Sequence, residues 1–431
     1  MNWQARTRCN DVSAEEPGQT VDVCGWVDAL RDHGNLRFIH LRDASGIVQI
    51  VFDPERSPGA FVGAASLKEE CVIWVRGVLR QRAAGTGNPQ IETGDVEIDA
   101  SDMRILSAAD PLPFKISEKA LVAGADRVET EQVSEELRLR HRYLDLRRPS
   151  AQNRLRVRHK MIRAMREALD SKDFIEIETP TLTRSTPEGA RDFLVPSRTA
   201  HGEFFALPQS PQLFKQMLMV GGVERYYQVA RCWRDEDMRP NRQPEFTQLD
   251  VEAAFIDESF IMSTMEAVTR AAFGAAGHQL PDDFPTMSYD DAMATYGSDK
   301  PDLRPDMPFF HMTNALANTN YGIFNSIISS GGLVAGICVK GQADALSKNE
   351  LQNNICTKIV PELGGRGMTW MKRVEGSWVS NITQFFSETE LNAIADLSNA
   401  TDGDVVMMIA DTNQAKALDV LGRLRDKYQR D

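Results

Sequence analysis

The residues best suited to chemistry lie in two strand-like runs, 225–234 and 246–252, joined by a loop rich in both charges. Alternate residues of a strand point to the same face of a sheet, so Arg234 and the ring of Phe246 lie on polar faces. Arg offers charged, bidentate donors for phosphate, and an aromatic ring can stack on a planar base. The polar faces carry Gln228, Cys232 and Arg234 in the first run, and Phe246, Gln248, Asp250 and Glu252 in the second.

Two interpretations of these faces stay open at this stage. One is an ordinary solvated sheet face, on which surface ion pairs contribute little to stability. The other is a nucleotide site, in which Arg234 and Arg242 bracket a loop that folds over phosphates. Upstream, Pro and Gly turns fix polar groups in 186–192 and 207–215. A site that activates an amino acid needs carboxylates to bind an ammonium group, a lysine to bind a carboxylate and an arginine to bind phosphate.

Several other kinds of site are absent from the sequence. There is no Gly-x-x-x-x-Gly-Lys-[Ser/Thr] loop, no Gly-x-Gly-x-x-Gly fingerprint and no His-Glu-x-x-His pair. The seven histidines do not cluster, so we expect no metal site built from them. The six cysteines lie far apart without a Cys-x-x-Cys pair, which argues against disulfides and favours a reducing cytoplasm.

The composition narrows the class of protein. With 431 residues, 42% hydrophobic and 26% charged, the chain can bury several cores and is no disordered tail. A net charge of −13 argues against a nonspecific DNA coater, although nucleic acid can still bind at a local basic patch. No apolar run approaches the roughly 20 residues of a membrane helix, and the start has no apolar signal region. We therefore expect no membrane association.

Short strands dominate the first hundred residues. Turn sequences at 34–35, 44–46 and 85–89 separate them, and five short strands suit a small closed barrel that hides its sheet edges. The obvious candidate is an OB-fold, a barrel that commonly binds oligonucleotides. The expected strands are 21–27, 36–42, 47–52, 72–79 and 96–100.

A linker and a basic segment follow. Residues 138–166 hold eleven Lys or Arg against the single acid Asp145, which is either a solvated helix face or a surface for a phosphate-rich partner. Apolar residues between Leu155 and Leu169 form a helical stripe, and a short strand at 174–177 ends before Pro180. Because proline cannot donate to a sheet ladder, this should be an edge or interface strand. The combination predicts a self-association surface.

The character changes again near Thr286. Strands are expected at 332–339, 367–372 and 404–410, and helices at 391–398 and 415–427. These elements predict a separate α+β unit without an evident catalytic cluster.

The motifs together resemble a known family. The segment Arg234-Asp-Glu236 followed by Arg242-x-x-x-Phe246-x-x-x-Asp250 is similar to motif 2 of class II aminoacyl-tRNA synthetases, and the helix, strand and Pro180 resemble motif 1, the dimer element. The family that fits more specifically is bacterial aspartyl-tRNA synthetase, which segments 141–147, 186–192, 208–215 and 296–302 resemble. The resemblance extends along the whole chain.

The resemblance implies a multidomain α+β protein. Its expected parts are an OB-fold anticodon-binding β-barrel (1–106), a hinge or linker (107–140), a class II antiparallel-sheet catalytic core with motifs 1 and 2 (141–304) and a GAD-like α+β insertion domain (305–431). The implied partners are L-aspartate, tRNA(Asp) and a second copy of the chain in a cytoplasmic homodimer, with ATP and Mg²⁺ as cofactors.

The resemblance also implies roles for individual residues. In the family reaction aspartate and ATP give aspartyl-adenylate, and aspartate then passes to the tRNA 3′ end, with positioning and charge stabilisation as the main needs. Arg234 is the implied catalytic residue, gripping the α-phosphate and the substrate carboxylate, and Glu252 is a weaker candidate for ATP or its Mg²⁺. ATP would also meet Asp235, Glu236, Gln243 and Phe246. Aspartate would meet Glu188, Ser210, Gln212, Lys215 and Asp250.

In the barrel, Phe38 lies opposite Ile39 by alternation and is not expected in the core. A lone exposed aromatic is common, but the resemblance makes Phe38 a stacking platform for an anticodon base, with Arg31 and Gln49 reading its neighbours. His33 and Gly85 resemble the family branch that accepts both tRNA(Asp) and tRNA(Asn).

The sequence departs from the family in one respect. In the family the catalytic domain resumes after the insertion with motif 3, and no such segment occurs in 253–431. We therefore expect an incomplete catalytic sheet and no arginine beside Lys215. The main alternative is a truncated, non-catalytic tRNA-binding paralogue. A class II ligase for asparagine or lysine is a third reading, against which Glu188-Gly-Ala-Arg191 and Gln212-x-x-Lys215 speak.

Overall fold

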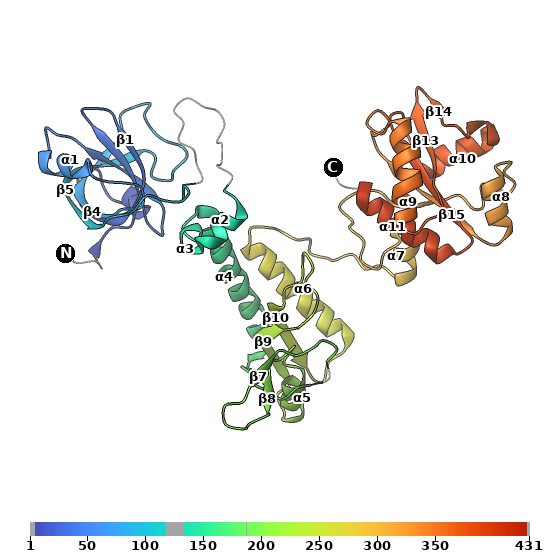
Figure 1. The fold of residues 1–431 in the computed structure, drawn as a ribbon, viewed down its shortest axis with the longest axis horizontal. Helices are drawn as coiled ribbons and strands as arrows, with labels where there is room; N and C mark the ends of the chain where they lie inside the picture. Colours follow the sequence, from blue (N-terminus) through green and yellow to red (C-terminus); the bar gives the residue numbers. More distant parts are fainter. Residues whose placement is uncertain (1–4, 118–132, 187, 429–431) are drawn as a thin grey trace. The chain divides into compact units, whose positions relative to one another are not determined.

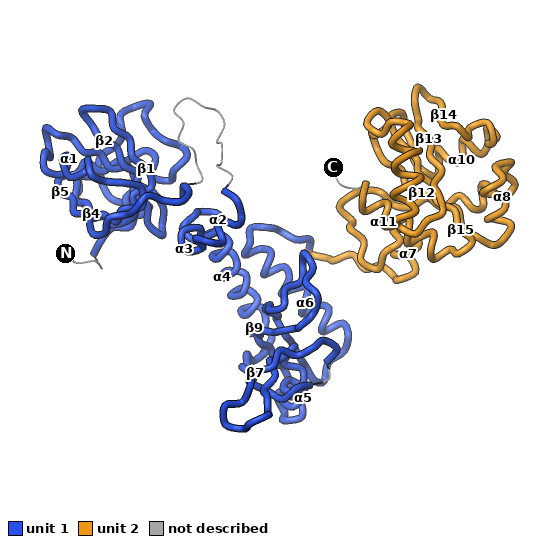
Figure 2. Tube along the Cα trace, in the orientation of Figure 1, with its two compact units in different colours: residues 1–281 blue, residues 282–431 orange. Residues whose placement is uncertain are grey.

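The computed structural model describes residues 5–117, 133–186 and 188–428. The chain divides into two compact units, residues 1–281 and 282–431 (Figures 1 and 2). In the part of the chain that is described, no helix is long and apolar enough to cross a membrane. The helical part of the expected linker falls on 118–132, outside the described residues.

Unit 1 begins with the closed five-stranded barrel that the sequence predicts. The strands join in the order β1-β2-β3-β5-β4, and alternate residues such as Ile39, Ile50 and Ile98 are buried inside. β1 and β5 run several residues beyond their expected ends. The elements are η2 (Asp11–Ala14), β1 (Thr20–Asp32), β2 (Arg37–Arg42), β3 (Ile47–Phe52), α1 (Pro58–Ala64), β4 (Val72–Gln81) and β5 (Val96–Ser107).

The rest of unit 1 is a three-stranded sheet packed against two long helices. The order is β10-β9-β6, with β6 parallel to β9 at the edge, as Pro180 predicts. In Figure 1, α4 and α6 run side by side over this sheet, and Leu169, Tyr227 and Val268 form the core between them. The elements are α2 (Glu135–Arg140), α3 (Arg142–Asp145), α4 (Pro149–Asp170), β6 (Ile175–Glu176), β7 (Leu194–Pro196), β8 (Phe204–Ala206), α5 (Gln212–Val220), β9 (Arg225–Trp233), β10 (Glu245–Ala253) and α6 (Glu258–Ala275).

The basic segment is partly neutralised within itself. The Asp145 carboxylate is buried, and the side chains of Arg138, Arg142 and Arg148 surround it. The apolar stripe of α4 is covered at its C-terminal end, whereas Leu155 is half exposed. An uncovered apolar stripe of this kind is compatible with the expected self-association surface.

Unit 2 is a five-stranded antiparallel sheet in the order β11-β12-β15-β13-β14, with helices on both faces. Alternate residues of the central strands enter opposite cores, as Met407 and Met408 do. The elements are α7 (Tyr289–Tyr296), β11 (Phe310–His311), α8 (Gly322–Ser329), β12 (Leu333–Val339), the π-helix η3 (Glu350–Ile359), α9 (Val360–Glu362), β13 (Thr369–Val374), β14 (Ser377–Val379), η4 (Thr383–Phe385), α10 (Glu388–Ser398), β15 (Val405–Asp411) and α11 (Gln414–Tyr428).

Unit 2 begins earlier than the boundary at 304/305 that the sequence suggested. Arg425 of α11 is almost fully buried and donates to the backbone oxygens of Met307 at 2.8 Å and Asp302 at 2.6 Å. Helix α7 packs on the same helix. These contacts place the segment before residue 305 in unit 2, which starts at Asp282.

Candidate active site and nucleic-acid groove

The sheet formed by β9 and β10 places the expected polar residues on a common face. The register pairs Phe246 with Cys232 and Asp250 with Gln228. Residues paired across an antiparallel ladder share a face, so the prediction drawn from alternation is confirmed. The 2.9 Å hydrogen bond from the Arg234 N–H to the Pro244 oxygen closes the connecting loop.

A buried charge cluster occupies the centre of this face. The Lys215 ammonium of α5 donates to Asp250 Oδ1 at 2.8 Å and lies 3.4 Å from a Glu252 carboxylate oxygen. The Lys215 and Asp250 side chains are only 12% and 9% exposed. Asp250 Oδ2 is buried and makes no hydrogen bond within the described residues. The cluster therefore has an unused carboxylate oxygen, the acceptor that an ammonium group seeks.

The pKa values of Lys215 in this cluster and of the nearby Cys232 are both raised. Burial opposes the charge on Lys215, but the carboxylates of Asp250 and Glu252 outweigh it and raise the lysine pKa. Burial raises the pKa of the Cys232 thiol to about 11, so this thiol stays neutral at physiological pH. The Lys215 ammonium therefore stays charged at physiological pH.

A second set of hydrogen bonds orients Gln228 below the cluster. The Tyr226 hydroxyl and the Thr179 hydroxyl both donate to Gln228 Oε1 at 2.9 Å. Because the amide oxygen is thereby occupied, the amide NH₂ of Gln228 remains as a donor. Neither Tyr226 nor Thr179 was singled out from the sequence.

The loop that carries Glu188 is anchored to the segment before α5. Ser210 Oγ donates to Glu188 Oε2 at 2.9 Å, so these two expected aspartate-binding residues are in contact. Buried Gln209, which sequence reasoning missed, accepts from the Ala190 N–H at 3.1 Å and donates to the Ala190 oxygen at 2.9 Å. Gln209 thus fixes the loop, and only its place in a Pro-rich turn hinted at this role.

The residues that the sequence predicts to contact ATP are arranged more loosely. The Arg234 guanidinium lies 5.1 Å from the centre of the Phe246 ring, a cation–π contact that orients both groups. Asp235, Glu236 and Gln243 are exposed in the loop, and within the described residues their side chains make no hydrogen bond to the sheet face. Gln212 lies half-buried on α5 one turn before Lys215. The structure therefore brings together Arg234 with Phe246 and Lys215 with Asp250, but not the loop residues.

The barrel carries a groove of about 630 Å³ that contains the other predicted residues. Arg31 pairs with Phe38 across β1 and β2, and the Phe38 ring is half-buried with the His33 ring edge-on at 5.5 Å. Gln49 donates to Glu97 at 2.9 Å and lies on the neighbouring strand. The lining includes four arginines against two acids: Arg31, Arg56, Arg80, Arg82, Asp53 and Glu97.

Gly85 lies in the loop 83–88 beside this groove. Its φ of +82° is in the left-handed region, and nothing lies within 4 Å of where a Cβ would stand. The conformation, rather than crowding, is therefore what favours glycine at this position.

The described part of the chain contains no group of three or more His, Cys, Asp or Glu side chains arranged to hold a metal ion. Asp250 and Glu252 are two carboxylates on β10, and both already contact Lys215.

Comparison with known proteins supports both regions. A family of class II tRNA synthetases (D, K and N) matches residues 134–394, and an OB-fold nucleic acid binding domain matches residues 21–106. The chain is 52% identical over 426 residues to the aspartate–tRNA(Asp/Asn) ligase 1 of Syntrophus aciditrophicus, covering 99% of this chain and 59% of the relative. It is 45% identical over 418 residues to the aspartate–tRNA(Asp/Asn) ligase of Bacillus cereus strain AH187, covering 97% and 68%.

A solved structure shows the same fold at lower identity. Asparaginyl-tRNA synthetase from Pyrococcus horikoshii, complexed with asparaginyl-adenylate, aligns with a TM-score of 0.55 at 20% identity, over 99% of this chain and 96% of that one. A groove-bearing barrel joined to a class II sheet defines a class II tRNA synthetase architecture. The chain belongs to the D, K and N class II tRNA synthetases and, within them, to the aspartate–tRNA(Asp/Asn) ligase family.

Proposed function

We propose that the protein is an aspartate–tRNA ligase that serves tRNA(Asp) and tRNA(Asn) in the cytoplasm. The observation that carries the proposal is the Lys215–Asp250 pair, with its unused buried Asp250 oxygen, on the face that also presents Arg234. A cation and carboxylates held a few ångströms apart are complementary to the carboxylate and ammonium of free aspartate.

The proposed first step joins aspartate to ATP. An oxygen of the aspartate α-carboxylate attacks the α-phosphorus, the bond to the bridging oxygen breaks, and pyrophosphate leaves with the electron pair. Arg234 binds the α-phosphate and the attacking carboxylate, and Phe246 stacks on adenine, with Asp235, Glu236 and Gln243 along the nucleotide. Glu188, Ser210, Gln212 and Asp250 hold the amino acid, and Lys215 pairs with its side-chain carboxylate. In the second step a ribose hydroxyl of the tRNA attacks the carbonyl carbon, and AMP leaves.

Magnesium accompanies ATP in this proposal. Mg²⁺ in such sites is bound through one or two carboxylates together with substrate phosphates, so a preformed protein cage is not needed. Glu252, one third exposed at 3.4 Å from Lys215, is the carboxylate available to share it. Magnesium would neutralise charge on the phosphates.

The barrel groove is proposed to hold the anticodon. Phe38 would stack on one base while Arg31 and Gln49 contact its neighbours, and His33 and Gly85 would set tolerance for both tRNAs. The uncovered stripe of α4 is proposed to meet a second copy in a homodimer.

Aspartate-dependent ATP–pyrophosphate exchange by the 431-residue chain tests the ligase proposal, with asparagine and lysine as controls. Exchange with aspartate alone is expected. Absence of exchange with every amino acid, together with retained tRNA binding, would replace the proposal with a non-catalytic tRNA-binding protein.

A further inference from the structure

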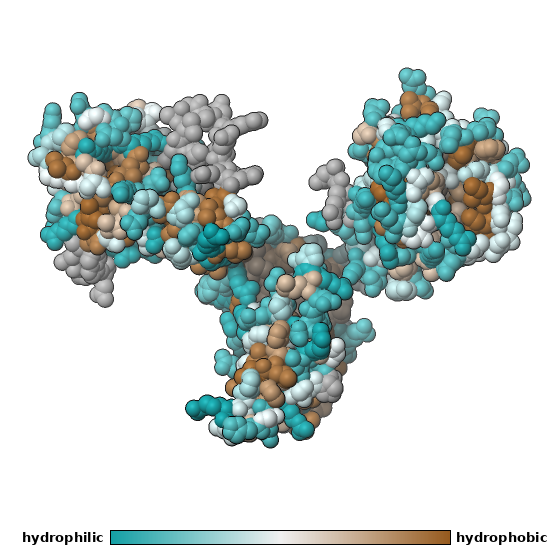
Figure 3. All heavy atoms as spheres, viewed as in Figure 1, coloured by the Kyte–Doolittle hydropathy of each residue, from teal (hydrophilic) through white to brown (hydrophobic). Residues whose placement is uncertain are grey.

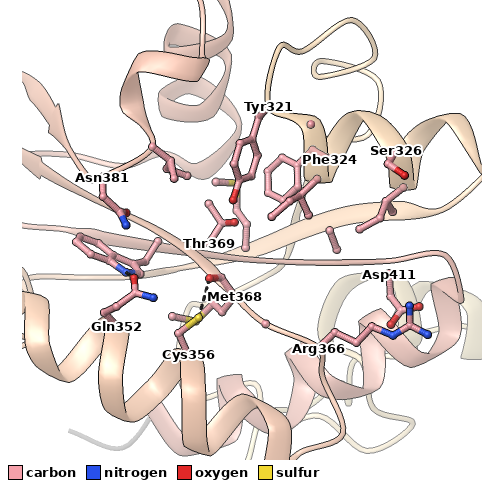
Figure 4. Close-up of a pocket in the computed structure, with 18 of the residues that line it drawn as sticks. Tyr321, Phe324, Ser326, Gln352, Cys356, Arg366, Met368, Thr369, Asn381 and Asp411 are labelled. Atoms are coloured by element: carbon pink, nitrogen blue, oxygen red, sulfur yellow. Dashed lines mark hydrogen bonds between the residues drawn. The ribbon is translucent and has the colours of Figure 1, made fainter.

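A cavity of about 670 Å³ lies wholly within unit 2 (Figure 4). Its lining comes from α8, which packs on one face of the sheet, and from the π-helix η3, which packs on the other. This volume is in the range of sites for small molecules. Figure 3 shows a hydrophobic patch where α8 lies, and Ile323 of the cavity lining is 59% exposed. The cavity is independent of the proposed ligase site, which belongs to unit 1.

Two opposite charges face each other at one end of the cavity. Figure 4 shows the Arg366 and Asp411 side chains pointing toward one another. Within the described residues, the exposed Arg366 side chain makes no hydrogen bond or ion pair. Asp411 is buried as a residue and uses only Oδ1, which accepts from the Asn413 N–H at 2.9 Å and from Thr412 Oγ1 at 3.5 Å, so Oδ2 makes no hydrogen bond there.

Two side-chain amides lie at the other end. Gln352 Oε1 accepts from the Trp370 indole N–H at 3.2 Å, so the Gln352 NH₂ group remains as a donor. The Ser380 hydroxyl donates to the Trp370 backbone oxygen at 2.7 Å and lies 3.4 Å from Asn381 Oδ1, so Asn381 offers its NH₂ group as a donor as well. Between the two ends the walls are the aromatic rings of Tyr321, Phe324 and Trp370 with Met368 and Met408.

We propose that this cavity binds a free L-α-amino acid whose side chain ends in a carbonyl or carboxylate oxygen. Its α-carboxylate pairs with Arg366, its ammonium meets the unused oxygen of Asp411, and its side-chain oxygen accepts from Gln352 and Asn381. A phosphate ligand fits less well, because the Asp411 carboxylate repels a dianion beside the one arginine of the lining. A purely apolar ligand would leave Asp411 and both amides unsatisfied.

The test uses L-glutamine as the probe with the full chain. Titration calorimetry should give saturable binding, and the indole N–H resonance of Trp370 should shift because Gln352 is its acceptor. N-acetyl-L-glutamine, which lacks the ammonium, and L-phenylalanine, which lacks the side-chain oxygen, should bind at least about tenfold more weakly. No binding of L-glutamine, L-asparagine or L-glutamate up to about 10 mM would overturn the proposal.

Matched variants locate the site. Arg366→Gln should weaken L-glutamine binding by roughly 10- to 100-fold, whereas Arg423→Gln, at an exposed arginine paired with Asp419 in the same unit, should not change it. Because Asp411→Asn alters the start of α11 and can disturb folding, Gln352→Leu serves as the second variant and should weaken binding while the fold is retained. Equal affinity in the wild type, Arg366→Gln and Gln352→Leu would overturn the assignment.

Discussion

The two faces of unit 1 that are proposed to meet substrate use charge in opposite ways. On the sheet, Lys215 and Asp250 are buried and already paired at 2.8 Å, with one carboxylate oxygen left over. In the barrel groove, Arg31 and His33 are exposed and surround a half-buried ring, Phe38. A small ligand that must be recognised atom by atom requires the first arrangement, whereas a polymer that brings its own phosphates and bases suits the second. Changes on the sheet should therefore be severe, and those in the groove graded.

The largest expected effect is that of Lys215→Met on aspartate activation. The substitution removes the proposed partner of the aspartate side-chain carboxylate and leaves Asp250 buried without its cation, so kcat/KM for aspartate-dependent pyrophosphate exchange should fall about 10³-fold. Lys358→Met, at an exposed lysine of η3, is the control and should be silent. A decrease in kcat/KM of less than tenfold would contradict the prediction that changes on the sheet are more severe than changes in the groove.

The same substitution should also lower stability and change its pH dependence. An uncompensated buried carboxylate costs about 3 kcal/mol in the free energy of unfolding, measurable by urea denaturation. Because the lysine pKa is raised above its ordinary value of 10.5 in the folded state, the contribution of Lys215 is fully present below pH 10.5 and is lost as pH rises through the raised pKa. The stability difference between wild type and variant should therefore shrink only above pH 10.5. A difference that already disappears near neutral pH would contradict the assignment.

Phe38→Ala should produce an intermediate effect confined to the tRNA. Loss of one base-stacking platform costs about 1–3 kcal/mol, or roughly 5- to 150-fold in tRNA affinity by filter binding. Pyrophosphate exchange, which needs no anticodon, should be unchanged. The control is Phe385→Ala, at an exposed ring in unit 2, which should leave tRNA affinity unchanged. Phe61→Ala is not a suitable control, because Phe61 packs on the barrel core. Equal losses in Phe38→Ala and Phe385→Ala would contradict the role of the groove.

The smallest expected effect concerns the choice between the two tRNAs. Gly85→Ala places a Cβ in open space but strains a backbone with φ +82°, at a cost of about 1 kcal/mol. The ratio of affinities for tRNA(Asp) and tRNA(Asn) should therefore change less than tenfold. If the ratio of affinities for tRNA(Asp) and tRNA(Asn) is unchanged in both Gly85→Ala and His33→Gln, these two residues do not influence the choice of tRNA.

The parts of the fold that depend on local pattern were predictable from the sequence. Alternation placed Asp250 and Phe246 on one face and left Phe38 outside the barrel core, and Pro180 marked the edge strand before it. Each of these follows from a period of two or from a missing backbone donor, which neighbouring residues determine.

Features that depend on distant residues were not predictable. Gln209 fixes a loop 19 residues away, and Arg425 holds Met307, 118 residues away, which moves the start of unit 2 back to Asp282. Likewise the pairing of Lys215 with Asp250 spans 35 residues. A single arginine or glutamine in a sequence carries no periodic signal that names its partner, so these contacts require the structure.

The most direct test of the central claim is the discrimination between aspartate and asparagine by direct binding to the wild-type unit 1 site and to its Lys215→Met variant, both in a chain that carries Arg366→Gln so that the proposed cavity of unit 2 does not contribute. Asparagine has the same shape as aspartate but lacks the side-chain charge that Lys215 is proposed to bind. The wild type should prefer aspartate by at least about 100-fold, because asparagine cannot make the charge-assisted hydrogen bond that the aspartate side chain is proposed to make with Lys215. The variant should bind both weakly and without preference. Equal binding of the two amino acids by the wild type, or a preference that survives in Lys215→Met, would contradict the account.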